Sequence, residues 1–161
     1  MKIRLARKKD RSKLLEFYRP IWKEKSEEEI NKILNHNFKK ENILIIAEEK
    51  NEIIGRTVYG PLNKFKDKNR LPKNLNEKNS CVSLGLLVKP SERSKGIGKA
   101  LKVEAFKRAS KEFERMYSTV TVGNIISLNL QKSLGLKKVG SYTTKKGEER
   151  KVFEKDLRKT L

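Results

Sequence analysis

The segment VKPSERSKGIGKAL, residues 88–101, joins a strand-like run to a helical pattern and contains two glycines, a proline, an arginine and three lysines. The run before it, Ser80–Val88, is the most strand-like stretch of the chain. Gly85 interrupts that run, and a glycine inside a strand often marks a bulge or a close backbone approach. Helical spacing of apolar residues follows in Lys99–Phe113. The fold must therefore accommodate a cationic, glycine-rich turn between the end of a strand and the start of a helix.

Two well-known phosphate-binding motifs are excluded at this turn. A nucleoside-triphosphate loop needs a glycine five residues before its Gly-Lys pair and a Ser or Thr after it, but Arg93 and Ala100 occupy those positions. The dinucleotide fingerprint needs a third glycine or alanine where Leu101 stands. The strand also ends too far before Gly96 for the tight turn of that fingerprint. Neither motif accounts for the segment.

The physics behind those motifs still applies to this turn. Glycines let backbone N–H groups converge on one point, and a following helix adds its free N–H groups and the positive end of its dipole. Arg93, Lys95 and Lys99 raise the local positive potential. Such a nest suits a pyrophosphate. The alternative is an ordinary glycine-containing turn with solvated lysines, and the turn alone leaves both interpretations open.

Length and composition limit the class of protein. With 161 residues the chain, 1–161, is expected to form a single domain with a core of its own. We expect no membrane span, because no apolar run has the required length, and the N-terminus does not resemble a signal peptide. The single cysteine, Cys81, excludes a disulfide framework and a cysteine metal site. A soluble, cytoplasmic protein without a metal is predicted.

A formal net charge of +20 is the most unusual feature of the composition. It would attract polyanions such as nucleic acid or the ribosome. However, the basic residues are spread from Lys2 to Lys159, and aromatic residues that would stack on bases are not interleaved with them. We therefore favour compositional drift over a dedicated nucleic-acid surface.

Periodicity and turn signals predict the order strand, two helices, three strands, helix, strand, helix, two strands. Asp10 is the expected N-cap of the first helix, which Pro20 kinks or ends, and Ser26–Glu29 is a capping box for the second. The aperiodic, lysine-rich segment Gly60–Asn79 is expected to be a mobile loop of functional importance. The other predicted elements are Lys2–Arg7, Ile43–Glu48, Glu52–Tyr59, Met116–Val122, Ser127–Leu134, Leu136–Thr144 and Lys151–Leu157.

The turn and a second block of residues resemble the GNAT N-acetyltransferase superfamily. The first block has the arrangement V-x-P-x-x-R-x-x-G-I-G-x-A-L, at Val88, Pro90, Arg93, Gly96, Ile97, Gly98, Ala100 and Leu101. The second opens a short helix after a strand, with Asn124, Ser127, Leu130, Gly135 and Leu136 at the usual offsets of that family. The element order of the whole chain fits the same fold.

The resemblance implies an α/β (α+β) fold with a mixed, mostly antiparallel sheet, helices on both faces, and strands four and five splayed at a bulge. Acetyl-CoA would enter the gap as cosubstrate. The backbone of Leu86, Leu87 and Val88 would pair with its pantetheine. Asn124 would hydrogen-bond the pantetheine arm, or cap the helix, or both, with Ser127 beside it. The residues that would hold the pyrophosphate are Arg93, Ser94, Lys95, Gly96, Ile97, Gly98 and Lys99.

The catalytic groups are less clear. By resemblance, the Val88 N–H is the oxyanion donor. Many relatives carry a tyrosine seven residues after the asparagine to protonate the leaving thiolate, and here that position holds Gln131, whose amide supplies no proton at neutral pH. Neither Ser80–Val88 nor Met116–Val122 contains a carboxylate that could act as general base. Other candidates are the hydroxyls of Tyr117, Ser118 and Thr119, and the single histidine, His36, which is better interpreted as a surface residue.

Direct acetyl transfer from acetyl-CoA to an amine is therefore the favoured function. A catalytically weak acyl-CoA-binding or regulatory module and a basic nucleic-acid- or ribosome-associated protein are the alternatives. The positive field favours acidic or neutral acceptors. Trp22 and Tyr59 are possible walls of the acceptor site, although core positions suit both better. A homodimer through the edge of the C-terminal hairpin is possible.

Overall fold

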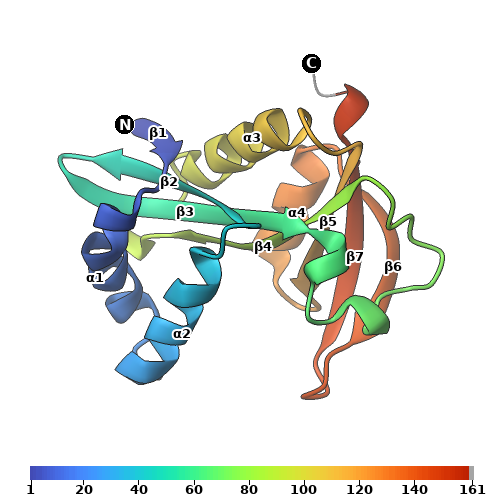
Figure 1. Cartoon of the computed structure of the whole chain (residues 1–161), viewed down its shortest axis with the longest axis horizontal. Helices are drawn as coiled ribbons and strands as arrows, with labels where there is room; N and C mark the ends of the chain where they lie inside the picture. The colour runs from blue at the N-terminus through green and yellow to red at the C-terminus, as the bar shows by residue number, and fades with distance from the viewer. Residues whose placement is uncertain (160–161) are drawn as a thin grey trace. The chain divides into compact units, whose positions relative to one another are not determined.

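The computed structural model describes residues 1–159 and has a mixed α/β fold with seven strands, mostly antiparallel, and four α-helices (Figure 1). Strands β4 and β5 are parallel. The order of elements is the one that the sequence predicts. The strands are β1 (Lys2–Leu5), β2 (Ile43–Glu49), β3 (Glu52–Pro61), β4 (Ser80–Val88), β5 (Arg115–Thr121), β6 (Lys137–Thr143) and β7 (Glu149–Asp156); the helices are α1 (Arg11–Ile21), α2 (Glu27–Asn37), α3 (Ile97–Ala109) and α4 (Ile125–Ser133).

The chain divides into two compact units. The first comprises Met1–Tyr59 and Gly85–Ala105, and the second comprises Gly60–Leu84 and the described residues from Phe106 onward. Strands β3 and β4 and helix α3 each continue from one unit into the other. The two units are described one after the other.

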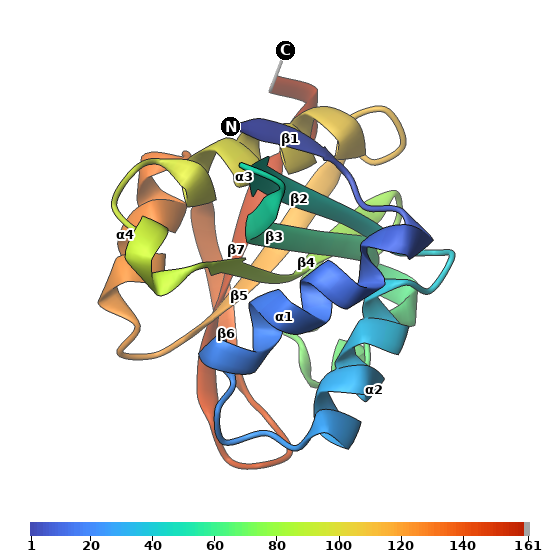
Figure 2. The same cartoon turned by 90° about the vertical axis from the view of Figure 1, so that its left-hand side faces the viewer.

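The first unit is built on an antiparallel arrangement of β1, β2 and β3. Its central hairpin turns at Lys50 and Asn51, both of which have positive φ, as a two-residue turn between twisted strands requires. Helices α1 and α2 lie side by side on one face of these strands, and α3 lies on the other (Figure 2). The unit thus has a layer of helix on both faces, as expected for the fold class.

The ends of α1 and α2 follow different rules. Ser26 Oγ accepts from the Glu29 N–H at 3.1 Å and the Glu29 carboxylate accepts from the Ser26 N–H at 3.0 Å, which confirms the predicted capping box. Asp10 occupies the N-cap position of α1, as predicted, but its side chain makes no capping bond to that helix. The carboxylate instead binds the Arg4 guanidinium and the Arg7 N–H. Helix α1 ends at Ile21, one residue after Pro20.

Close packing joins β3 to α3 inside the first unit. Leu101 is fully buried, and a Cβ atom added at Gly55 would lie 3.0 Å from its Cδ1 atom and 3.2 Å from Cγ2 of Ile97. Only glycine leaves the helix this close to the strand. The next residue, Arg56, points to the opposite face of β3, because side chains alternate along a strand.

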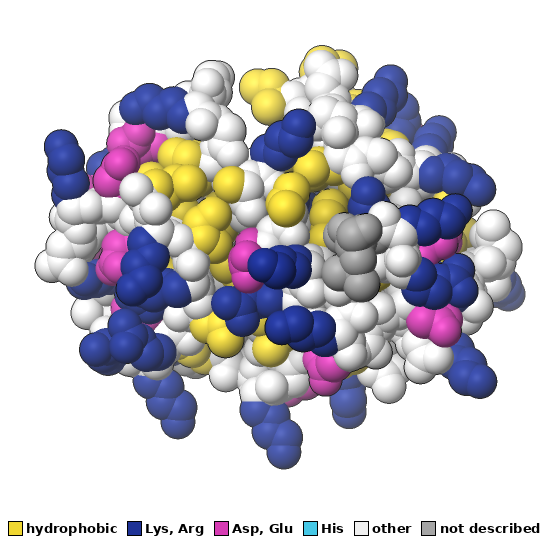
Figure 3. Space-filling model, turned by 90° about the horizontal axis from the view of Figure 1, so that it is seen from above, with side chains coloured by type: hydrophobic (Ala, Val, Ile, Leu, Met, Phe, Trp, Pro, Cys, Tyr) yellow, Lys and Arg dark blue, Asp and Glu magenta, His cyan; other side chains and the backbone are white. Residues whose placement is uncertain are grey.

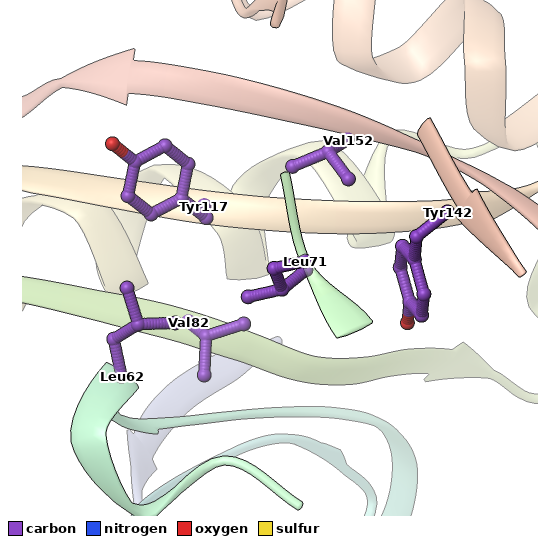
Figure 4. Packing of buried hydrophobic residues seen from close by; sticks show 6 residues of the cluster. All are labelled: Leu62, Leu71, Val82, Tyr117, Tyr142 and Val152. Carbon is purple, nitrogen blue, oxygen red and sulfur yellow. The ribbon is translucent and has the colours of Figure 1, made fainter. Parts of the chain in front are cut away.

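The second unit contains the strand order β4–β5–β7–β6. Strand β4 pairs in parallel with β5 only over Ser80–Val82. The β5–β7 pair is antiparallel over the whole of β5, and the β6–β7 pair is antiparallel with a register shift between Lys138 and Gly140. Figure 4 shows the core cluster of this unit. Its members are Leu62, Leu71, Val82, Tyr117, Tyr142 and Val152.

Two leucines of the segment Gly60–Asn79 pack into this core. The segment forms two 3₁₀ turns, Leu62–Lys64 and Lys68–Arg70, and both Leu62 and Leu71 are buried in the cluster. In addition, the Asn76 N–H donates to the Tyr117 hydroxyl at 3.0 Å. Apolar residues are few here, but they hold the segment against its own unit, which the expectation of a mobile loop did not anticipate.

The contact between this segment and β6 gives a first prediction. A Cβ atom added at Gly140 would lie 2.6 Å from Cγ of Pro72, so Gly140→Ala must displace the segment. We expect a loss of about 1–3 kcal/mol in the free energy of unfolding, as for other overpacked sites. Urea unfolding followed by circular dichroism measures it. The exposed neighbour Ser141→Ala, expected within about 0.5 kcal/mol, is the control, and equal stability of the two variants would contradict the contact.

Candidate cofactor and active site

The end of β4 presents part of its backbone away from β3. The Lys89 N–H donates to the Ile54 carbonyl at 2.8 Å, so Lys89 faces β3. Because backbone groups of successive strand residues point to opposite sides, Leu87 also faces β3, and Leu86 and Val88 face away from it. The Leu87 carbonyl oxygen indeed lies 3.2 Å from the Cβ position at Gly55. Of the three residues that the sequence suggests for pantetheine pairing, two present their backbone groups outward.

The turn after β4 has positive φ at two positions, of which only the serine is strained. A 3₁₀ turn, Pro90–Glu92, leads into Ser94 with φ +65° and Gly96 with φ +82°. A left-handed conformation costs a residue such as serine on the order of 1 kcal/mol, and such strain is common at ligand sites. A side chain at Gly96 would meet no atom within 4 Å. The backbone at Gly96 therefore borders open space.

Helix α3 begins in this turn, two residues earlier than the predicted start at Lys99. The Ala100 N–H is the first that bonds within the helix, donating to the Gly96 carbonyl at 3.0 Å. Among the described residues, the N–H groups of Ile97, Gly98 and Lys99 therefore have no backbone acceptor, as at any helix N-terminus. These donors, with the positive end of the helix dipole, form a site for an anion.

The three cations of the turn differ in their partners. Arg93 donates through Nε to the Val88 carbonyl at 3.2 Å. Lys95 pairs with Glu92 at 2.7 Å, and this bond raises the pKa of the Lys95 ammonium and lowers the pKa of the Glu92 carboxyl. Lys99 is exposed and has no ion pair within residues 1–159. Lys99 is thus the cation of this turn whose charge is not paired with another described residue.

Helix α4 supplies the second group of predicted residues, in the second unit. Asn124 caps this helix: its side-chain oxygen accepts from the Ser127 N–H at 3.1 Å. Asn124 is exposed, so capping leaves its amide NH₂ available to a ligand. Val122, Ile125 and Ile126, which flank the cap, are exposed apolar residues, with Ile126 exposed to 84%.

The remaining catalytic candidates have the following surroundings. Gln131 is 2% exposed, and its side-chain oxygen has no hydrogen-bond partner in the described chain. Tyr117 and Ser118 are buried, and burial raises the pKa of the Tyr117 hydroxyl, which keeps it protonated at neutral pH. Thr119 accepts from Arg150 at 3.3 Å. His36 is partly buried on α2 of the first unit.

One candidate residue was missed in the sequence analysis. Arg56 lies in the middle of the otherwise apolar strand β3 and is only 3% exposed. Tyr18 and Trp22 flank it, and Gly85 lies over the end of its guanidinium. The single charge inside the run IIGRTVYG, residues 53–60, was the available signal. Tyr59 is also buried, at 3% exposed, which agrees with its interpretation as a core aromatic.

Surface charge, membrane spans and metal sites complete the description. Lys and Arg side chains are spread over the face shown in Figure 3 and do not gather at one element. Within residues 1–159, no helix combines the length and hydropathy needed to cross a bilayer. The same residues contain no group of three or more His, Cys, Asp or Glu side chains placed to hold a metal ion.

A sequence profile described as the acetyltransferase (GNAT) family matches residues 11–136. No curated protein matches the chain significantly. Three solved structures with similar folds are a ribosomal-protein-alanine N-acetyltransferase from Brucella melitensis (22% identity, 97% of this chain and 99% of that chain, TM-score 0.73), an aminoglycoside 6′-N-acetyltransferase complexed with coenzyme A (15%, 98% and 97%, 0.76), and a putative acetyltransferase from Salmonella typhimurium with its cofactor acetyl-CoA (18%, 98% and 94%, 0.73).

The profile covers most of the chain, including both the turn after β4 and the start of α4. The chain therefore belongs to the acetyltransferase (GNAT) family. At these low identities the solved structures establish the likeness of fold, which confirms the predicted fold class. The roles of individual residues stay predictions.

Proposed function

We propose that this protein transfers the acetyl group of acetyl-CoA directly to an amine. The observation that carries the proposal is the cradle after β4, where open space at Gly96 borders the free N–H groups of Ile97, Gly98 and Lys99. This cradle has the donors, the dipole and the missing side chain that a pyrophosphate needs. Two of the similar structures contain coenzyme A or acetyl-CoA, which supports the same ligand here.

The end of β4 and the turn after it have the following roles in this proposal. The N–H groups from Ser94 to Lys99 hold the pyrophosphate, and the exposed Lys99 side chain adds positive charge; the Arg93 N–H instead donates to the Pro90 carbonyl at 3.4 Å. Outward backbone groups of Leu86 and Val88 bind the pantetheine. Bound acetyl-CoA supplies a thioester that a neutral amine can attack. The Val88 N–H donates to the carbonyl oxygen on which negative charge develops.

Neither of the two side chains considered for proton transfer in this site can carry it out. Gln131 cannot protonate a thiolate, and Tyr117 keeps its own proton at neutral pH, so neither removes a proton from an ammonium acceptor. We infer that water takes the proton of the amine. The rate should then rise with pH as the acceptor loses its proton, up to the pKa of the acceptor amine.

Release of coenzyme A tests the proposal. The protein with acetyl-CoA should release thiol faster when amines are present, and peptides with a free N-terminus, lysine and simple alkylamines are suitable acceptors. Each acceptor that works should show a rate that follows its own ammonium pKa. Tight binding of acetyl-CoA by calorimetry without release on any amine would instead support an acyl-CoA-binding module. Absence of binding by the folded protein would overturn the proposal.

A further inference from the structure

We propose that Arg56 binds an anionic group of the acceptor, so that the substrate is an amine that also carries a carboxylate. This inference rests on the proposed acetyl transfer, because it concerns the acceptor of that reaction. Its physical basis is a buried charge whose outer nitrogens have no partner in the protein.

Residues of α1 and α2 and the residue that follows α1 hold the Arg56 side chain in place. Its Nε atom donates to the Tyr18 hydroxyl at 2.7 Å, and that hydroxyl donates in turn to Oδ1 of Asn37 at 2.6 Å. The rings of Tyr18 and Trp22 lie 5.2 and 5.9 Å from its central carbon and offer cation–π contacts. These contacts orient the guanidinium and leave its two terminal nitrogens free.

No acidic side chain neutralises this charge. Within residues 1–159, Arg56 takes part in no ion pair, and neither Nη1 nor Nη2 donates a hydrogen bond; Nη1 is fully buried as well. Buried arginines are normally paired with carboxylates, because a desolvated charge without a partner is costly. A planar fork with two free donors matches the two oxygens of a carboxylate, as it matches those of a phosphate.

Gly85 lies against the end of the guanidinium, whose Nη1 atom is fully buried. A Cβ atom at Gly85 would lie 2.9 Å from Nη1 and 3.8 Å from Nη2 of Arg56, so Gly85 lies directly over Nη1 and a side chain there would displace the guanidinium. Gly85 is exposed and has φ +123°, and the Thr57 hydroxyl holds its carbonyl at 3.1 Å. The backbone is thus fixed in a conformation that favours glycine, at a position where any side chain would displace the Arg56 guanidinium.

The location fits an acceptor site on β4. Val88, the proposed donor to the acetyl carbonyl, is three positions after Gly85, which is about 10 Å along a strand. An amine with a carboxylate within roughly that distance could reach both positions. The net charge of +20 would attract such a molecule more strongly than a purely cationic amine.

Matched pairs of acceptors test the inference. We would compare a series of ω-amino carboxylates with their primary amides, which differ only in the anion. The unaltered protein should prefer the acid by about 10-fold or more in kcat/KM, the usual strength of a hydrogen bond to a charged group. Arg56→Gln should bring the acid-to-amide ratio close to 1, and Arg56→Lys, which keeps a point charge but loses the fork, should give an intermediate ratio.

Two further variants guard against loss of folding. Arg19→Gln removes an exposed arginine next to Tyr18 that pairs with Glu27, and should leave the ratio as it is in the unaltered protein. Gly85→Ala should lower the ratio while Arg56 is still present, because a methyl group 2.9 Å from Nη1 would displace the guanidinium. The fluorescence of Trp22, the single tryptophan of the chain, reports whether the first unit is folded in each variant.

A thermal shift provides a readout that does not need turnover. The acids, but not the amides, should raise the melting temperature of the unaltered protein, and Arg56→Gln should abolish the difference. Equal turnover and equal shifts with acids and amides would overturn the anion site and leave acetyl transfer standing. An Arg56-dependent shift without release of coenzyme A on any amine would support the anion site and overturn the proposed transfer.

Discussion

Gly96→Val should weaken the binding of acetyl-CoA by at least about 100-fold, measured by calorimetric titration. Valine methyl groups at this position would occupy the open space beside the free N–H groups of Ile97, Gly98 and Lys99. Loss of two hydrogen bonds to a phosphate, at about 1.5–3 kcal/mol each, accounts for a change of this size. Coenzyme A without the acetyl group should lose affinity to the same extent, because the pyrophosphate is common to both.

Gly147→Val is the matched control for this variant. Gly147 lies in the turn between β6 and β7 with φ +86°, close to the +82° of Gly96, and a side chain at either position meets no atom within 4 Å. Both variants therefore force valine into the same unfavourable backbone region and should lose similar stability. Only Gly96→Val obstructs the proposed cradle. If the two variants bound acetyl-CoA equally well, the cradle after β4 would not be the pyrophosphate site.

Local signals explain why the turn after β4 was predictable from sequence. The signals for this turn are the glycines, the strand before them and the helix after them, and all of these signals come from residues that are close in sequence. The order of elements likewise follows from local periodicity. Boundaries were less accurate: α3 begins at Ile97 and not at Lys99, because Gly96 already turns the chain into the helix. A positive φ at Ser94 has no sequence signal of its own.

Partners that are distant in sequence account for what was missed. The environment of Arg56 depends on Tyr18, Asn37 and Gly85, which no local pattern connects to β3. Lys95 was expected to add free positive charge, yet Glu92 binds it. In each case, the chemistry of a side chain depends on which residue the fold brings next to it.

The ion pair between Arg4 and Asp10 should make the first unit sensitive to acid. Asp10 is 3% exposed, and its carboxylate receives Nη1 and Nη2 of Arg4 at 2.8 and 2.9 Å and the Arg7 N–H at 2.7 Å. Hydrogen bonding to Arg4 lowers the pKa of the Asp10 carboxyl far below its ordinary value. Asp10→Asn removes the charge from this pair and should cost about 3 kcal/mol in the free energy of unfolding at pH 7.

The pH dependence identifies the cause of that loss. A carboxyl whose pKa is lowered by folding stabilises the protein above its unfolded pKa, near 4, and this contribution disappears as the pH falls from there through the folded pKa. Below pH 4 the unaltered protein should therefore lose stability more steeply than Asp10→Asn, and the difference between the two should shrink. Urea unfolding followed by Trp22 fluorescence measures both in the unit that contains Asp10.

Glu28→Gln is the control for net charge. It removes one exposed carboxylate from α2, whose contact with Lys32 is 3.8 Å long, and should change stability by less than about 1 kcal/mol. A pH-independent gap between the unaltered protein and Asp10→Asn would mean that the asparagine disturbs packing and not the ion pair. A narrowing gap shows that the junction of β1, the start of α1 and β2, where Glu48 also binds Arg4 at 3.2 Å, depends on an ionised Asp10.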